Sequence, residues 1–315
     1  MTKFSGKVLV TGGAGFIGSH LVRALVDRGD RVVVVDDLST GFEANVPQGV
    51  EFHAIAAQDI QKVPGALVGV SHVYHLAAMA SVQASLEDPL ASHAACATST
   101  VAVCQAARLA GVKRVVYAGS ASAYGVPAGP VQREDDTLSP LSPYAAAKLA
   151  GELYLQAFGA AFGLETARLR FFNVYGPRQR PDSPYSGVIA LFAKALIEGR
   201  QPTIFGDGLQ TRDFVHVSDV VAALLAAGEK AAMVGQVAQV GTGKPTTLLE
   251  LVHLLAQVLG RQVQPAFGPG RAGDIRHSCA NLDRIHALLG YQPTVGLAEG
   301  LRETLDWMKD SAKGS

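Results

Sequence analysis

A tyrosine and a lysine stand four positions apart in the stretch SPYAAAKLAGE, residues 142–152. Residues four apart share one face of a helix, and Ser142 and Pro143 suit an N-cap and a first turn, so Tyr144 is expected near a helix start. A phenol titrates at about 10 in water, and a lysine ammonium one turn away, here Lys148, favours the phenolate. The spacing therefore predicts an acid–base centre that acts on an alcohol.

The same pair would also suit a surface phenol beside a solvated lysine, so support from other segments is needed. Upstream, the stretch AGSASAYG ends an apolar run that is typical of a strand. Its Ser120 and Ser122 could form hydrogen bonds with a substrate oxygen.

Independent support comes from residues 7–38, KVLVTGGAGFIGSHLVRALVDRGDRVVVVDDL, whose pattern is strand, glycine turn, helix and strand. Gly12, Gly15 and Gly18 suit the tight turn, the approach of backbone amides to a pyrophosphate, and the packing of the helix on the strand. The helix N-terminus would face the phosphates. Asp36 ends the second strand, where it can bind an adenosine ribose and repel a 2′-phosphate, which favours NAD over NADP. Hydride transfer between an alcohol and a ketone would use all three features.

The rest of the chain continues this alternation of strands and helices. Residues 72–78 and 114–120 are typical of strands, and 89–111 of a long helix ended by Gly111. We therefore predict an α/β fold with a Rossmann-type doubly wound parallel sheet. The NAD-binding domain is expected at 1–175, with a later segment near 212–242 returning to it. A smaller α/β substrate-binding domain is expected at 176–211 and 243–315.

The composition limits the partners. The 315 residues include 27 basic and 27 acidic side chains, so no general attraction to nucleic acid or anionic membrane is expected. Three scattered cysteines predict neither a disulfide framework nor a zinc site, and no metal is expected. The N-terminus enters a strand at once, and the most apolar run, 220–227, is far shorter than a membrane span. We expect a soluble cytoplasmic protein.

Five stretches carry a resemblance to a known family: TGGAGFIGSHL, the serines before AYG, SPYAAAKLAGE, RFFNVYGPRQ and RDFVHVSDV. Together they resemble the extended short-chain dehydrogenases/reductases, and within them the nucleotide-sugar 4-epimerases. The resemblance implies NAD-dependent oxidation of a UDP-hexose at C4, rotation of the 4-keto sugar, and reduction from the other face. The dehydratases and decarboxylases of this family carry acidic residues where this chain has Ala121 and Ser122.

The resemblance also implies roles for individual residues. The catalytic residues would be Ser120, Tyr144 and Lys148. Residues that would line the cofactor, besides Tyr144 and Lys148, are Gly12, Gly15, Phe16, Ile17, Gly18, Asp36, Leu38, Ser39, Thr40, Gly41, Asp59, Ile60, Leu76, Ala77, Ala78 and Phe171. Residues that would bind the UDP-sugar, besides Tyr144, are Ser81, Ser120, Ser122, Asn173, Val188, Thr203, Phe205, Arg212, Arg271, Asp274 and Ser278.

The clearest indication of the sugar is Ser278, four residues after Asp274. Strict UDP-glucose epimerases resemble one another in having a tyrosine there, whereas a serine opens space for an N-acetyl group. UDP-N-acetylglucosamine and UDP-N-acetylgalactosamine are therefore the expected substrates, and the plain UDP-sugars would fit as well. Local packing alone could also explain a serine at this position.

Other interpretations stay open. A reductase, dehydratase or decarboxylase of sugar nucleotides would release an altered product, and a dinucleotide-sensing protein without activity would not need Ser120, Tyr144 and Lys148 together. Relatives often have an asparagine where Cys96 stands. Relatives also pair the helix equivalent to 89–111 across a dimer, so a homodimer is expected.

Overall fold

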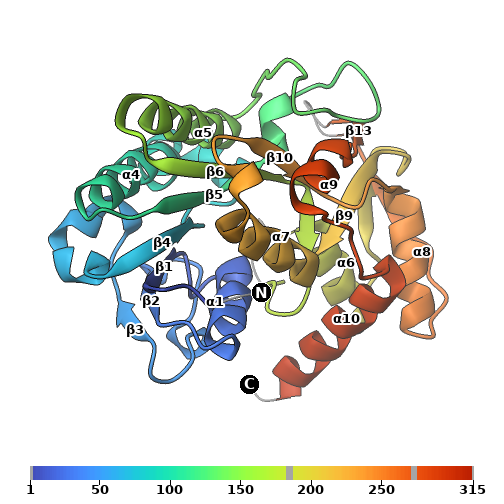
Figure 1. Cartoon of the computed structure of the whole chain (residues 1–315). Coiled ribbons are helices and arrows are strands. Elements are labelled where there is room, and N and C mark those ends of the chain that lie inside the picture. Colours follow the sequence, from blue (N-terminus) through green and yellow to red (C-terminus); the bar gives the residue numbers. More distant parts are fainter. Residues whose placement is uncertain (1–2, 182–186, 271–274, 314–315) are drawn as a thin grey trace.

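A seven-stranded parallel sheet forms the centre of the larger part of the molecule (Figure 1). The computed structural model describes residues 3–181, 187–270 and 275–313, with side chains described as far as residue 311. The strand order is β10-β6-β5-β4-β1-β2-β3, and every neighbouring pair is parallel. The strands are β1 (Lys7–Thr11), β2 (Val32–Val35), β3 (Glu51–His53), β4 (Val70–His75), β5 (Arg114–Ser120), β6 (Glu165–Phe171) and β10 (Val237–Val240).

Helices cover both faces of this sheet, which explains why its strands are apolar on both sides. Val8 and Val10 point toward one core, with α1 and α7, whereas Leu9 between them points toward the other, with α4 and α5. The helices and short turns of this part are α1 (Phe16–Asp27), η1 (Glu43–Asn45), η2 (Ala57–Lys62), η3 (Pro64–Leu67), α2 (Val82–Glu87), α3 (Pro89–His93), η4 (Ala94–Thr98), α4 (Ser99–Leu109), η5 (Ala121–Tyr124), α5 (Pro143–Phe162), α7 (Val217–Glu229), η6 (Ala231–Met233) and α9 (Asp283–Leu289). The predicted doubly wound sheet is thereby confirmed.

Helix α5 begins and ends where the sequence pattern predicts. Ser142 caps α5 by accepting a hydrogen bond from the amide of Ala145, and Gly163, in the left-handed region at φ 71°, ends it. The expected helix over 89–111 is present with one difference. Its turn at Ala94–Thr98 is a π-helix, which joins α3 to α4. Such single π-turns are frequent at functional sites.

A smaller sheet and a third core build the rest of the molecule. Strand β9 (Thr211–His216) pairs with β7 (Asn173–Tyr175), β11 (Pro245–Thr247) and β13 (His277–Ser278), while β8 (Thr203–Phe205) pairs with β12 (Ala266–Gly268). The apolar faces of α6 (Val188–Ile197), α8 (Leu248–Val258) and α10 (Leu297–Lys313) pack around this third core. Strands β7 and β9 therefore lie in the smaller sheet. The next elements along the chain return to the larger part: α7 packs on one face of the larger sheet, and β10 is a strand of it. The domain boundaries themselves stay a prediction.

None of the described helices combines the length and the apolar character that a membrane crossing requires. The three cysteines Cys96, Cys104 and Cys279 are free and buried.

Candidate active site

The carboxyl ends of the parallel strands gather most of the predicted cofactor residues. Gly12 follows β1 with φ 72°, and a Cβ atom there would lie 2.7 Å from the amide nitrogen of Ala77, just beyond β4. A Cβ on Gly18 would lie 2.0 Å from the carbonyl oxygen of Gly12. Among the described residues no side chain caps α1 at Gly15, so its first amides face the turn. The turn thus has the cradle that a dinucleotide pyrophosphate requires.

Asp36 closes this cradle from the end of β2. Its side chain is buried, and its two oxygens accept hydrogen bonds from the amides of Ala14 (2.9 Å) and Leu38 (2.8 Å). Burial raises the pKa of the carboxyl, and the two amides lower it. Each carboxylate oxygen keeps capacity for a further donor, such as a ribose hydroxyl.

The loop at Leu38–Gly41 lies against the same turn. A Cβ on Gly41 would lie 2.7 Å from the backbone of Ala14, so the approach requires a glycine. Phe16 and Ile17 begin α1, and Leu76 binds the carbonyl oxygen of Thr11 through its amide at 3.1 Å.

Two predicted adenine neighbours differ in exposure. Asp59 on η2 is half-buried, and its side chain forms an ion pair with Lys62 at 2.8 Å. The side chain of Ile60 is fully buried in the core beneath α4, so a ligand could contact only its backbone. Sequence alone could not separate the two, because they are adjacent on one short turn.

The predicted acid–base pair lies on α5, which packs closely on β5. The hydroxyl of Tyr117, in the middle of β5, donates to the backbone carbonyl of Lys148 at 3.0 Å. The ammonium nitrogen of Lys148 lies 4.3 Å from the centre of the Tyr117 ring. A Cβ on Gly151 would lie 2.4 Å from the Tyr117 hydroxyl, so this glycine allows the helix to approach the sheet. Tyr117 was not predicted from the sequence, although the alternation in RVVYAGS places it on the side facing this helix.

Ser120 ends β5 next to this pair. Its hydroxyl accepts a hydrogen bond from the amide of Ser122 and lies 2.8 Å from the hydroxyl of Ser122. Strand register places Ser120 beside Phe171 at the end of β6. The structure therefore brings Ser120, Tyr144, Lys148 and Phe171 to the edge of the sheet that carries the glycine cradle.

Burial dominates the titration of the pair in the cofactor-free chain. Burial raises the pKa of Tyr144 to about 12, and a hydrogen bond with Ser120 opposes this change. Burial also lowers the pKa of Lys148 to about 8, against the attraction of Glu152. Tyr144 is therefore a neutral phenol at pH 7 in the cofactor-free chain, because desolvation disfavours the phenolate more than the hydrogen bond with Ser120 favours it.

A hydrogen-bonded chain that sequence analysis did not find connects the cofactor cradle to the π-turn. The amide of Ala77 donates to the hydroxyl of Thr11, which lies 2.7 Å from Nδ1 of His75; Nε2 of His75 lies 3.1 Å from the hydroxyl of Thr100. The Thr100 hydroxyl donates to the carbonyl of Cys96, so His75 must donate at Nε2 and accept at Nδ1. Burial lowers the pKa of His75 to about 3, which keeps the ring neutral.

The predicted substrate residues form separate groups. Asn173 and Ser278 lie on β7 and β13, both of which pair with β9, the strand of Arg212. Arg212 donates to the carbonyl oxygens of Thr211 and Ile275. Ser81 caps α2, Val188 begins α6, and Thr203 and Phe205 lie exposed on β8. Arg271 and Asp274 lie outside the described residues.

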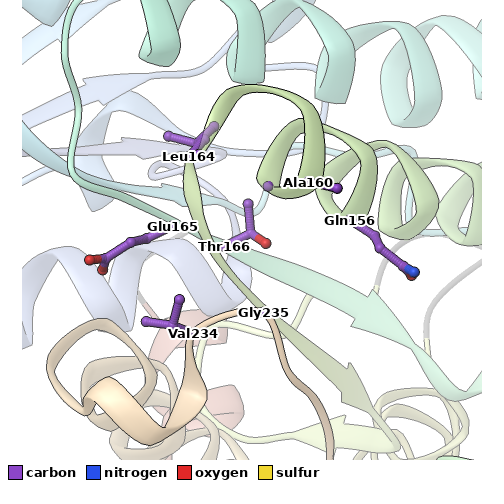
Figure 2. Close-up of a pocket in the computed structure, with 9 residues that line it drawn as sticks. Gln156, Ala160, Leu164, Glu165, Thr166, Val234 and Gly235 are labelled. Atoms are coloured by element: carbon purple, nitrogen blue, oxygen red, sulfur yellow. The ribbon is translucent and has the colours of Figure 1, made fainter.

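A cavity at the other end of α5 is distinct from this site (Figure 2). It is lined by Gln156, Leu164, Glu165 and Val234, next to the amino end of β6. Gln156 accepts a hydrogen bond from Arg168, and Glu165 pairs with Arg114. Since Gln156 and Glu165 are already paired, we assign no chemistry to this cavity.

The glycine cradle and the Tyr/Lys helix define the class, an enzyme of the short-chain dehydrogenase/reductase type. The chain belongs to the NAD dependent epimerase/dehydratase family, whose family model matches residues 8–241. The prediction that NAD is the cofactor is thereby confirmed, and the residues of the cradle fit it.

Individual relatives match over nearly the whole length. The chain is 41% identical to the UDP-glucose 4-epimerase of Mycolicibacterium smegmatis, over 98% of this chain and 100% of that protein. Its structure is similar to that of UDP-N-acetylglucosamine 4-epimerase from Methanobrevibacter ruminantium in complex with UDP-N-acetylmuramic acid (TM-score 0.93, 34% identity, 99% and 100% of the chains). It is also similar to the UDP-glucose 4-epimerase of Thermus thermophilus in complex with NAD (TM-score 0.88, 38% identity, 96% and 99% of the chains).

Proposed function

We propose that the protein is an NAD-dependent 4-epimerase that interconverts UDP-N-acetylglucosamine and UDP-N-acetylgalactosamine, with the plain UDP-hexoses as further substrates. The coarser part, a UDP-sugar 4-epimerase, is supported by relatives that match the whole chain. The observation that carries the chemistry is the position of Tyr144, Lys148 and Ser120 beside the glycine cradle.

In this proposal each side chain has a separate task. Ser120 holds the oxygen at C4 of the sugar, and Tyr144 takes the proton of that hydroxyl. Bound NAD⁺ would accept and return the hydride at C4, and its positive charge would favour the phenolate of Tyr144. Lys148 supplies a second positive charge one turn along α5.

A net epimerisation follows if the 4-keto sugar rotates in the site before reduction, so that hydride returns to its other face. Ala121 and Ser122 follow Ser120, and neither side chain can supply an acid or base for an elimination. A dehydratase-type reaction would lack its catalytic group in this turn. The enzyme is therefore expected to return both the hydride and the proton to the sugar.

The choice of sugar depends on Ser278. Its side chain is half-buried on β13, in register with Arg212 on β9. We propose that this small side chain leaves space for the N-acetyl group beside C2. A tyrosine at the same position would fill that space.

The test is to incubate the purified enzyme with UDP-N-acetylglucosamine and, separately, with UDP-glucose, and to identify products by NMR. Formation of UDP-N-acetylgalactosamine that is lost in Tyr144→Phe would support the chemistry. Ser278→Tyr should then reduce turnover of the N-acetyl sugar about 10- to 200-fold, the usual range for one misfitting group, and retain turnover of UDP-glucose. Conversion of UDP-glucose alone by the unchanged enzyme would overturn the assignment of the sugar.

The homodimer also remains a proposal. Leu109 on α4 and Leu153 and Phe162 on α5 are exposed, and a second subunit could cover such apolar side chains. Sedimentation of the purified enzyme would decide its oligomeric state.

A further inference from the structure

A buried polar network lies behind the catalytic pair. Tyr144, Lys148 and Glu152 follow one another at intervals of four on α5, so they share a face of that helix. Glu152 and Arg170 of β6 form an ion pair in which both side chains are at most 5% exposed. The guanidinium nitrogen Nε lies 3.0 Å from one carboxylate oxygen and 3.2 Å from the other.

Gly119, which has no side chain, leaves space beside the Glu152–Arg170 ion pair. Gly119 lies beside Arg170 in the register of β5 and β6, one residue before Ser120. A Cβ on Gly119 would lie 3.5 Å from the carboxylate of Glu152 and 3.0 Å from the carbonyl oxygen of Leu169. The Glu152–Arg170 ion pair therefore lies near the carboxyl ends of β5 and β6, next to the turn Ser120–Ser122, which we call the serine turn.

The hydroxyl of Tyr124 accepts hydrogen bonds from two side chains of this network. Tyr124 ends η5, the single turn that begins after Ser120, and is 2% exposed. Its oxygen accepts hydrogen bonds from Arg170 Nη1 at 2.8 Å and from Gln239 Nε2 at 2.5 Å. One hydroxyl thus joins the serine turn to β6 and β10.

The network continues to the strand that carries Ser278. The side-chain oxygen of Gln239 accepts from the amide of Asn281 at 3.1 Å. The neighbouring amide of Ala280 donates to Asp213 of β9 at 3.1 Å. The segment after β13 is consequently fixed to the same side chain that binds Tyr124.

We propose that Tyr124 is a positioning residue, whose hydroxyl sets the Ser120–Ser122 turn against Tyr144 on α5 and couples that turn to the segment carrying Ser278. This inference rests on the proposed function, in which Ser120 and Tyr144 act on one sugar oxygen. Residues 124, 170 and 239 are far apart in the chain. The network that they form connects the serine turn, through Arg170, to Glu152 on the catalytic helix α5.

The variant Tyr124→Phe tests this role because it removes only the hydroxyl. Tyr74→Phe is a matched control: Tyr74 is fully buried, and its hydroxyl has no hydrogen-bond partner among the described residues. Both variants are prepared as NAD⁺ holoenzymes. We expect Tyr124→Phe to lower kcat for the UDP-sugar about tenfold, equivalent to about 1.4 kcal/mol, with KM changed less than twofold. Tyr74→Phe should leave both constants unchanged.

A second readout does not depend on the sugar. Displacement of Ser120 weakens its hydrogen bond with Tyr144, so the pKa of the Tyr144 phenol should rise in Tyr124→Phe. Ultraviolet difference titration of each holoenzyme against its Tyr144→Phe counterpart measures this pKa. If Tyr124→Phe matches the unchanged enzyme in both kcat and titration, the role of Tyr124 is overturned.

Two further outcomes are informative. Absence of turnover of any UDP-sugar by the unchanged enzyme would refute the proposed function, whereas the titration would still decide the role of Tyr124. If Tyr124→Phe does not fold, Gln239→Met removes the second donor to the same hydroxyl and keeps a side chain of similar length. It should shift kcat and the titration in the same direction, and no shift in either would overturn the inference.

Discussion

Replacing Lys148 by methionine should stabilise the cofactor-free protein while abolishing its activity. The side chain is 3% exposed, and burial lowers its pKa from 10.5 to about 8. At about 1.4 kcal/mol per pH unit, keeping the ammonium charged inside the fold costs about 3 kcal/mol at pH 7. Methionine removes that cost but loses the contact between the ammonium and the Tyr117 ring, worth about 1 kcal/mol. A net gain of about 2 kcal/mol is expected.

The pH dependence gives a sharper check. Below pH 8 the lysine is charged in the folded and unfolded chain alike, and the full cost is present. Between about pH 8 and 10.5 the unfolded chain binds more protons than the folded one, so the stability of the unchanged protein rises with pH. Lys148→Met has no such group, and its advantage should shrink to less than about 1 kcal/mol at pH 10.

Urea unfolding at pH 7 and pH 10 measures both effects, with turnover of the UDP-sugar followed in parallel. Bound dinucleotide has to be removed first, because a ligand of the folded state adds its own stabilisation. Lys244→Met, at an exposed lysine, is the control and should change stability by less than about 0.5 kcal/mol. A Lys148→Met protein that is less stable at pH 7, or an advantage that is the same at both pH values, would refute the reasoning.

Three other substitutions test the cradle, the larger sheet and the buried histidine. Gly18→Ala places a Cβ 2.0 Å from the carbonyl oxygen of Gly12, so the turn must shift. Calorimetric titration should therefore show at least a tenfold loss of NAD⁺ affinity. Undiminished affinity would show that the turn adapts freely. Arg114→Met leaves Glu165 without its buried partner and frees three backbone carbonyls at the end of α7, so chemical denaturation should show a loss of about 3 to 5 kcal/mol, and a loss below about 1 kcal/mol would argue against this role. His75 is neutral in the fold with a pKa of about 3, whereas in the unfolded chain it protonates near 6.5. This group alone should therefore lower the stability by about 1.4 kcal/mol per pH unit as the pH drops from about 6 to 4. His75→Asn should show a shallower fall, and equal slopes would contradict this assignment.

Local features of the chain were predictable because they depend on neighbours in sequence. The glycine turn requires φ 72° at Gly12 and no side chain at Gly18, and both demands are readable from the residue types. The spacing of Tyr144 and Lys148 follows from the helical repeat, and the capping of α5 from Ser142. These features together indicated a dinucleotide-binding sheet with an acid–base pair at its edge.

Other properties depend on segments that meet only in the folded protein. Strand register decides that Arg170 faces Glu152, and sheet order decides that Gln239 reaches Tyr124. Ile60 is adjacent to Asp59 in sequence, yet its side chain is enclosed by a core that α4 completes.

The titration of the catalytic pair also belongs to the tertiary structure. The sequence places Lys148 one turn from Tyr144, and this spacing alone favours the phenolate. The folded chain removes water from both side chains, and this desolvation raises the pKa of the phenol and lowers that of the ammonium. The residue types and their spacing were thus determined by the sequence, whereas their protonation was decided by the burial that the packing of α5 on β5 imposes.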